Sequence, residues 1–407
     1  MAEQRRKAGA TLEDLWIYTR GTRKGDRKPD YGKVKRWRVT VTDHDSERET
    51  EAFDRKVDAE QFRDAANARL ATGTYVTEKA GMVTVEEVYE EWLTQQSGTA
   101  DSTQATRESA WDCWVSPKWR KTEVRQVRKS GVRTWVTEMT EDGAGAATVE
   151  SAVGVLRLLL ALAVEDKRIA SNPAVGVKLP PRTHRPRAYL SHAQVWELAG
   201  TIDPRYRTLT LFLAYTGLRF GEAAALEVRD IDFLRRRIEV RQQVTEVKGR
   251  LTWTPTKGKR RRSVPFPRFL ADDLSVLCQG KKRTDQVFQA PKGGTLRLNT
   301  WRRRIWNTCI DTLQAVDDEG VAHADFPDAT PHDMRHTAAS LAISANANVK
   351  AVQTMLGHRS AALTLDTYSD LFPADLDGVA AAFDREVEAL RRPADDAAGN
   401  GETGTSR

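Results

Sequence analysis

The chain has 407 residues, a formal net charge of +7 and 30% charged residues. This length exceeds what one hydrophobic core usually serves, so we expect two or three domains. The basic balance, with a pI near 9.2, favours a polyanionic partner such as nucleic acid, although charge on solvated faces gives the same excess. The three cysteines form no CxxC pair, which argues against a disulfide framework or a zinc ribbon and suits a reducing cytoplasm.

No segment of the sequence is typical of a secretory signal or a membrane span. The N-terminus has no apolar core after its charges. The most apolar stretch, Val153 to Val164, contains Gly154 and Arg157 and is shorter than the roughly 20 residues that a bilayer requires. We therefore expect no membrane partner.

The first eighty residues or so mix short β-like runs with one helical run. Strands are predicted at Leu15 to Arg20, Trp37 to Thr42 and Thr50 to Phe53, and a helix from about Val57 to Leu70. This pattern indicates a small sheet backed by a helix. Basic side chains crowd the first two strands and their connection, which predicts a positive face for nucleic acid unless they are only solvated loop charges. They include Arg20, Arg23, Lys24, Arg27, Lys28, Lys33, Lys35, Arg36 and Arg38.

An all-α block of four or five helices follows. Thr84 and Glu87 form a capping-box pattern. Asp101 or Ser102 could cap a second helix, and Thr148 a long apolar third one. The block ends at the basic, proline-rich segment around Pro180 and Pro181, which cannot be helical and predicts an extended linker; a polar, Gly-rich tail closes the chain.

The last large region carries the candidate chemistry. In TLTLFLAYTGLRFGEAAALEV a helix should stop near Gly217, which leaves Arg219 at the junction with the next helix. An arginine there needs an anionic partner, and its fork matches phosphate. Glu222 could orient it, although a purely structural Arg219 to Glu222 ion pair has the same spacing.

A β section comes next, where alternating β-branched residues around VKGR and TKGK indicate successive hairpin strands. Lys257 lies at the second turn. The basic run there is either a general phosphate-tracking patch or a loop that delivers one lysine to a scissile bond. The run consists of Lys257, Lys259, Arg260, Arg261 and Arg262.

In TPHDMRHTAAS a helix should start at Thr330 or Pro331, with His332 and Arg335 on one face near its N-terminus. These two residues suit an anion, or merely cap and solvate the helix end. His332 and His336 also have the spacing of a metal-binding pair, but no third ligand accompanies them.

The segment VKAVQTMLGHRSAALTLDTY predicts a short helix that ends at Gly357, then His358, then a helical turn with Tyr368. Taken singly, Tyr368 is typical of a packing aromatic. Two arginines, a lysine, two histidines and a tyrosine in this order, without a nucleotide, metal or serine motif, favour a functional role over packing alone.

At these motifs the sequence resembles the tyrosine recombinase, or phage integrase, family. The matching pieces are TGLRFGE, TKGKRRRSVP, HDMRH, LGHRS and LDTY, in the family's order. Lys257 precedes Pro265 by eight residues and His358 precedes Tyr368 by ten, intervals that are similar to those of the family. The earlier helical block and the opening segment resemble its core-binding and arm-binding modules less specifically.

The resemblance implies a multidomain, mainly α protein. It would have an α+β arm-type DNA-binding domain at 1–78 (a three-stranded sheet plus a helix), an all-α SAM-like core-binding domain at 82–178 and a linker at 179–189. A mixed α+β, mostly α catalytic domain would span 190–392, followed by a disordered tail at 393–407.

The resemblance also implies the roles of the residues. Tyr368 would attack a DNA phosphodiester and form a 3′-phosphotyrosyl link, with Arg219, Arg335 and His358 binding the phosphate oxygens. His332 would be the base and Lys257 the acid for the 5′-oxygen, with neither ATP nor a metal needed.

The implied partners are core and arm attachment sites on double-stranded DNA, a homotetramer on that DNA, and possible accessory proteins, namely a host DNA-bending factor and an excisionase, at the bacterial nucleoid. A helix at about Asp377 to Arg391 would pack on a neighbouring protomer or within its own domain. A Xer-like or transposon recombinase and a non-catalytic DNA-binding relative are the alternatives; the opening segment favours an integrase.

Overall fold

The structure is a computed structural model that describes residues 8–44, 46–182, 187–255, 261–315, 326–358 and 360–368, with 383–384 and 387–388. The chain divides into two compact units, with the boundary between residues 184 and 185. That boundary falls within the expected linker 179–189. The finer partition of the first unit into 1–78 and 82–178 stays a prediction. The predicted helix near the C-terminus and the tail lie almost entirely outside the described residues.

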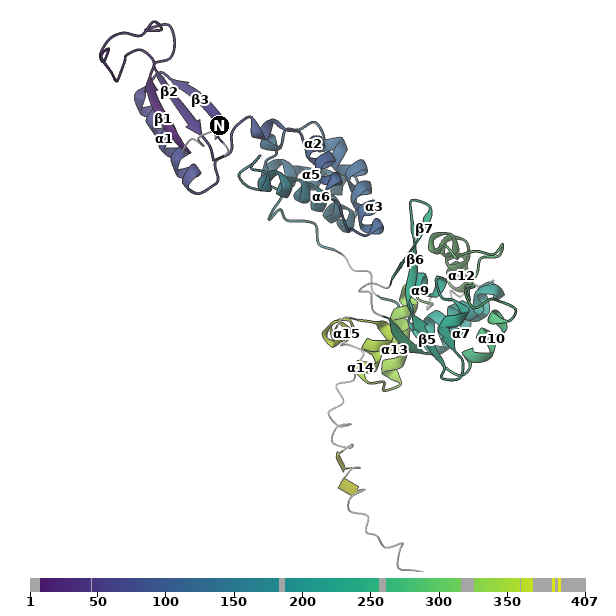
Figure 1. Cartoon of the computed structure of the whole chain (residues 1–407). Coiled ribbons are helices and arrows are strands. Elements are labelled where there is room, and N and C mark those ends of the chain that lie inside the picture. Colours follow the sequence, from purple (N-terminus) through teal and green to yellow (C-terminus); the bar gives the residue numbers. More distant parts are fainter. Residues whose placement is uncertain are drawn as a thin grey trace, which may run out of the picture. The chain divides into compact units, whose positions relative to one another are not determined.

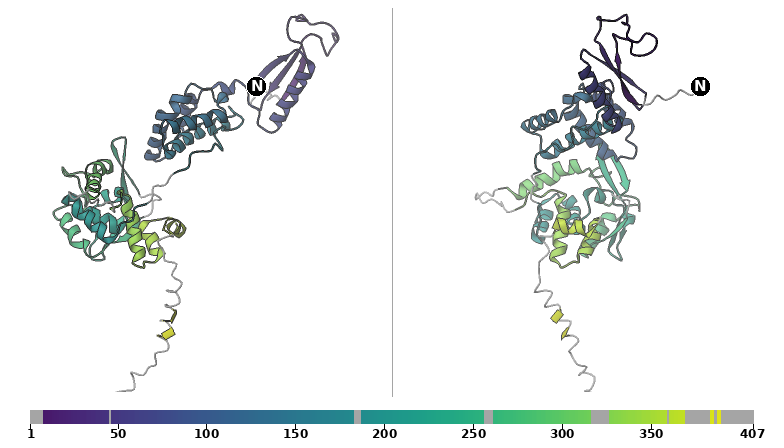
Figure 2. Two further views of the ribbon diagram at one scale, coloured as in Figure 1. Left: turned by 180° about the vertical axis from the view of Figure 1, so that it is seen from behind. Right: turned by 90° about the vertical axis from the view of Figure 1, so that its left-hand side faces the viewer.

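The first unit begins with an antiparallel sheet in the order β1 (Gly9–Asp14), β2 (Trp37–Thr42), β3 (Arg48–Phe53). Helix α1 (Lys56–Ala71) covers one face of this sheet (Figures 1 and 2). The small core consists of Val39 and Val41 from β2 and of apolar residues of α1. The second and third strands and the helix agree with the sequence pattern, but the strand predicted at Leu15 to Arg20 is wrong.

Instead of a strand, the residues after Asp14 form a loop that hydrogen bonds to Asp14 and to Val34 stabilise. The carboxylate of Asp14 accepts the backbone N–H groups of Trp16 and Ile17, and the indole N–H of Trp16 donates to the carbonyl of Val34 at 2.7 Å. The Trp16 and Tyr31 rings lie 5.2 Å apart. The β-like aromatic residues therefore stabilise a loop rather than a ladder.

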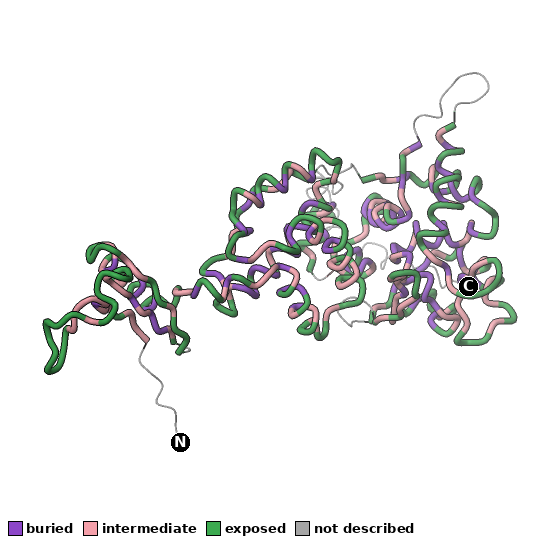
Figure 3. Tube along the Cα trace, turned by 90° about the horizontal axis from the view of Figure 1, so that it is seen from above, coloured by how far each residue is buried: buried purple, intermediate pink, exposed green. Residues whose placement is uncertain are grey.

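The helical block of the first unit consists of α2 (Val85–Thr94), α3 (Asp101–Ala110), α4 (Ser116–Trp119), α5 (Lys129–Glu141) and α6 (Ala146–Glu165). The predicted capping box of Thr84 and Glu87 is present. The other two predicted caps are wrong, because α3 and α6 follow Ala100 and Gly145, neither of which makes a side-chain cap. Buried and exposed stretches alternate along these helices (Figure 3).

Helix α6 is the central element of this block. By length and composition alone its 20 residues could span a membrane. It is longer than the apolar stretch seen in the sequence. Its side chains Val149, Val153, Leu156 and Leu160 are nevertheless fully buried against α2, α3 and α5. This packing is that of a core helix.

The second unit is mostly helical. Helix α8 (Arg207–Thr216) lies at its centre and contacts α7 (His192–Thr201), α10 (Leu270–Cys278) and α13 (Asp333–Ser344). Phe212 is fully buried there. The other described helices are α9 (Phe220–Ala224), α11 (Leu298–Trp301), α12 (Asn307–Leu313), α14 (Val349–Leu356) and α15 (Ala361–Tyr368).

Two small antiparallel sheets accompany these helices. One has the order β4 (Ile231–Asp232), β5 (Arg237–Val240), β8 (Arg262–Pro265), and the other pairs β6 (Gln242–Val247) with β7 (Arg250–Pro255). The predicted VKGR turn joins β6 and β7, with positive φ angles at Lys248 and Gly249. Strand β8 pairs with β5 and not with β7, so the expected run of successive hairpins is wrong at its last step.

Candidate active site

The ends of several helices of the second unit meet around Arg219. Helix α8 stops at Gly217, whose left-handed φ of 66° ends the helix as predicted, and Arg219 is the residue before α9. An added Cβ at Gly217 would lie 2.9 Å from Leu356 Cδ2, so α8 and α14 approach each other closely here. The Arg219 side chain is 38% exposed, which leaves its guanidinium open to a ligand.

Glu222 is the carboxylate at the centre of this region. It is 2% exposed, and its oxygens accept the backbone N–H of Arg219 at 2.9 Å and the Arg219 guanidinium at 3.2 Å. Burial alone would raise the pKa of Glu222, but the hydrogen bonds and charges of Arg262 and then of Arg219 together lower it. The carboxylate is therefore ionised, and it pairs with Arg219 at the predicted spacing of three residues.

Arg335, on α13, is a buried cation. It is 3% exposed and donates to the carbonyl oxygens of Gly217 at 2.8 Å and Leu356 at 2.5 Å. Burial, and next the charge of Arg219, lower its pKa to about 9. A buried guanidinium whose own hydrogen bonds go to neutral carbonyls leaves a positive potential that an anion such as phosphate would offset.

Three histidines lie beside these arginines. His332 precedes the first turn of α13, and the rings of His332 and His336 are 5.3 Å apart. His358 follows α14, and its Nδ1 lies 2.9 Å from the Thr364 hydroxyl. Burial is the largest cause that lowers the pKa of all three, to about 4 for His336 and His358, and nearby arginines lower it further. The imidazoles are therefore neutral at pH 7.

Tyr368 ends α15 and is 1% exposed. Its hydroxyl lies 2.9 Å from Nδ1 of His336, and its ring stacks on that of His358 at 6.4 Å. Burial raises its pKa to about 12, although Arg335 and Arg219 act in the opposite direction. The backbone carbonyl just before it, that of Thr367, accepts a hydrogen bond from Arg187 at 2.8 Å.

The structure thus brings six of the predicted residues together in one region, namely Arg219, Glu222, His332, Arg335, His358 and Tyr368.

The predicted basic loop does not join them as a whole. Lys257, Lys259 and Arg260 lie outside the described residues. Arg261 is exposed, as a DNA-contacting residue would be. For Arg262 the expectation of DNA contact is corrected, because its side chain is 10% exposed and pairs with Glu222.

The basic residues predicted in the first unit differ in their surroundings. Lys33 and Lys35 are exposed in the loop before β2. Arg36 pairs with Asp14 at 3.0 Å, and Arg38 pairs with Glu13 at 2.6 Å. Of these four residues, Lys33 and Lys35 are the two without an ion pair among the described residues.

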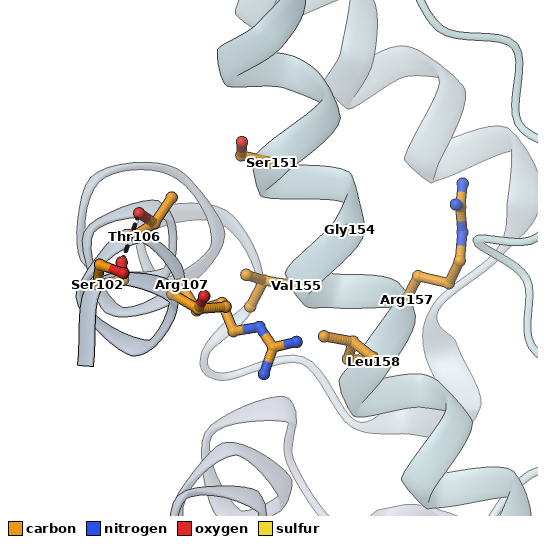
Figure 4. Close-up of a pocket in the computed structure, with 9 residues that line it drawn as sticks. Ser102, Thr106, Arg107, Ser151, Gly154, Val155, Arg157 and Leu158 are labelled. Carbon is orange, nitrogen blue, oxygen red and sulfur yellow. Dashed lines mark hydrogen bonds between the residues drawn. The ribbon is translucent and has the colours of Figure 1, made fainter. Parts of the chain in front are cut away.

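A hollow of about 600 Å³ lies elsewhere, on the helical block between α3 and α6 (Figure 4). Small polar residues and two arginines line it, and the Thr106 hydroxyl donates to the Ser102 carbonyl at 2.9 Å. None of the six gathered residues lines this hollow. Within the described part of the chain, no group of three or more His, Cys, Asp or Glu side chains is placed to hold a metal ion.

Sequence reasoning missed two contacts of this region. The sequence pattern presents His336 only as one of a metal-like pair with His332, yet His336 is the partner of the Tyr368 hydroxyl. Arg262 was grouped with its basic neighbours. The spacing of HDMRH places His336 one turn from His332 on α13, but nothing in the sequence pairs it with a residue 32 positions away.

Comparison with known proteins identifies the family. The phage integrase family profile matches residues 188–374. The integrase of Mycobacterium phage L5 is 26% identical over 318 residues, covering 76% of this chain and 83% of that protein. The tyrosine recombinase XerC of Corynebacterium efficiens is 27% identical over 240 residues, covering 56% and 69%.

Solved structures share the fold. The Tn1549 transposon integrase, in complex with a circular intermediate DNA, superposes with a TM-score of 0.63 at 21% identity, over 74% of this chain and 99% of that chain. A lambda integrase tetramer bound to a Holliday junction gives 0.54 at 15% identity, over 82% and 92%. With its ordered motifs and these relatives, the region 188–374 belongs to the phage integrase family of tyrosine recombinases.

Proposed function

We propose that this protein is a site-specific DNA recombinase that cuts and rejoins strands through a covalent 3′-phosphotyrosyl link at Tyr368, for the integration and excision of a mobile element. One observation carries the proposal. Arg219 and the buried Arg335 create a positive site, and the buried phenol of Tyr368 lies within the reach of their charges. Such a site suits a phosphodiester beside a nucleophile.

The bond changes follow from these groups. The phenolic oxygen of Tyr368 attacks phosphorus in line, the bond from phosphorus to the 5′-oxygen breaks, and the phenolic proton passes to a base. Arg219, Arg335 and His358 bind the non-bridging oxygens as charge develops. Lys257 protonates the leaving 5′-oxygen. Rejoining reverses these steps, and because the covalent link keeps the phosphodiester energy, no ATP or metal is required.

His332 is the proposed base, since its neutral imidazole follows from the lowered pKa. In this structure the phenolic hydroxyl is hydrogen-bonded to His336 and not to His332. Use of His332 therefore requires the Tyr368 segment to leave His336 as it approaches a phosphate.

The proposed DNA partners are double-stranded attachment sites that contain core-type and arm-type sequences. The protein would assemble on this DNA as a homotetramer. The solved lambda integrase tetramer on a Holliday junction and the DNA-bound Tn1549 integrase support this assembly by analogy. A host DNA-bending factor and an excisionase would complete the reaction, at the nucleoid in the cytoplasm of a bacterial host. The resemblance to XerC supports a chromosome-resolving role as the second candidate.

A nicked suicide substrate tests the chemistry. When the wild-type protein cleaves such DNA, the short strand diffuses away and the protein stays attached. We expect covalent protein–DNA product from the wild type and none from Tyr368→Phe, which should still bind the site. Covalent product from Tyr368→Phe at the wild-type level would exclude this nucleophile.

Deletion of residues 1–78 separates the integrase from the Xer-like alternative. An arm-binding module should be needed for integration but not for binding of the core site. Unchanged integration by the shortened protein would refute the arm assignment.

A further inference from the structure

Arg262 lies at the start of β8, and all three nitrogens of its guanidinium form hydrogen bonds within the protein. Its two terminal nitrogens donate to the two carboxylate oxygens of Glu222, at 2.9 and 2.7 Å, and its Nε donates to the carbonyl of Met355 at 3.1 Å. A two-pronged pairing of this kind fixes both partners in orientation as well as distance. Each of its three nitrogens thus has a partner inside the protein, and the side chain is only 10% exposed, so little of it faces a DNA phosphate.

The first of these contacts connects Arg262 to the arginine of the proposed site. Glu222 binds Arg219 through the same carboxylate that Arg262 holds. Glu222 is fully buried, so it cannot turn to solvent if Arg262 is removed. The orientation of Arg219 therefore depends on Arg262 through one shared carboxylate.

The second contact connects Arg262 to the segment that carries His358. Arg262 binds the Met355 carbonyl, and Arg335 binds the next carbonyl, that of Leu356. Both cations thus lie at the C-terminal end of α14, where free carbonyls favour positive charge. At Gly357 an added Cβ would lie 2.9 Å from Cδ of Arg262, so the chain turns toward His358 directly against this side chain.

We propose that Arg262 is a positioning residue that holds Arg219, through Glu222, and the His358 segment, through the Met355 carbonyl, in one geometry around the scissile phosphate. The inference rests on the proposed function, because it names what holds that site together.

Its neighbour Arg261 provides a matched comparison, because it is exposed and adjacent in sequence. A residue that contacts DNA phosphate lowers the slope of log affinity against log salt by about one when it is removed. A positioning residue leaves that slope unchanged and slows cleavage of DNA that is already bound. The two roles therefore predict opposite results in two measurements.

The experiment uses the full chain with Arg262→Gln, Arg262→Lys and Arg261→Gln. Equilibrium binding to the core site is measured from low to high salt, and covalent product is measured in a single turnover at saturating DNA. For Arg262→Gln we expect an unchanged salt slope and cleavage slower by about 10²-fold, the loss that follows a small misplacement of reacting groups. Arg262→Lys should recover part of the rate, and Arg261→Gln should lower the salt slope.

Several outcomes would overturn the inference. Wild-type cleavage by Arg262→Gln would show that the contacts do not position the site. A salt slope lowered by Arg262→Gln as much as by Arg261→Gln would make Arg262 a DNA contact. If Arg262→Gln does not fold, Arg262→Lys decides, and its cleavage at the wild-type rate would contradict the need for the fork. Absence of covalent product from the wild type would instead refute the proposed function.

Discussion

The hydroxyl of Tyr368 and Nδ1 of His336 are joined by a hydrogen bond of 2.9 Å. Burial raises the pKa of Tyr368 to about 12 and lowers the pKa of His336 to about 4. At neutral pH the bond therefore joins a protonated phenol to a neutral imidazole, and the tautomer of the imidazole sets which of the two donates.

The strength of this bond can be measured by a double-mutant cycle. His336→Phe leaves the buried hydroxyl without this hydrogen-bond partner, and Tyr368→Phe leaves Nδ1 of the imidazole without its partner. We expect each change to cost about 1–3 kcal/mol and the two to couple by about 1 kcal/mol, because the second change removes a group already unpaired. Urea unfolding of the four proteins measures this coupling. Strictly additive losses would show that the bond is absent in solution.

The sequence predicted the parts of this region whose cause is local. Gly217 and Gly357 end α8 and α14 in left-handed conformations, so the positions of Arg219 and His358 follow from where the helices stop. His332 directly precedes α13, which starts at Asp333, two or three residues after the predicted start, where Thr330 and Asp333 exchange hydrogen bonds.

Contacts between distant segments were not predictable in this way. Arg261 and Arg262 are the same residue type in one basic run, and only the approach of Glu222 and α14 to β8 separates their roles. The aromatic residues after Asp14 have strand propensity, but the Asp14 carboxylate and the Val34 carbonyl bind them as a loop. Propensity and charge describe a residue alone, whereas these outcomes depend on its partners.

Gly221 sets the distance between α9 and β6. A Cβ at this position would overlap the backbone carbonyl of Val244, so Gly221→Ala must push α9 and the adjacent Arg219 away from the strand. We expect a loss of about 1–3 kcal/mol in the free energy of unfolding, together with slower DNA cleavage. Urea unfolding and single-turnover cleavage measure the two effects.

Gly200, on α7, is the matched control, because a Cβ there meets nothing within 4 Å. Gly200→Ala should stabilise the protein by about 0.5–1 kcal/mol through helix propensity. Equal effects of the two substitutions on unfolding would contradict the close approach at Gly221.

The buried histidines make stability depend on pH. In the unfolded chain His336 and His358 should titrate near 6.5, but burial, and then nearby cations including Arg335, lower their native pKa to about 4. Between about pH 6.5 and 4 the unfolded state therefore binds more protons, so the native state loses stability as the pH falls through this window.

Substitution isolates the contribution of the histidines from that of the carboxylates. The melting temperature of the wild type should fall more between pH 7 and pH 5 than that of His336→Asn or His358→Asn. Thermal unfolding at the two pH values provides the measurement. The same decrease in all three proteins would mean that these imidazoles are not buried as neutral groups.

Lys257 can be tested through the leaving group. If its ammonium protonates the 5′-oxygen as the phosphodiester breaks, a sulfur atom in that position should remove the need for the proton, because a thiolate leaves readily without one. Lys257→Ala should therefore cleave the normal substrate more slowly by about 10²-fold or more and the 5′-thio substrate at close to the wild-type rate. Arg335→Ala is the contrast, because loss of phosphate binding should slow both substrates alike. Single-turnover formation of the covalent complex gives the rates, and an equal loss on both substrates by Lys257→Ala would exclude the acid role.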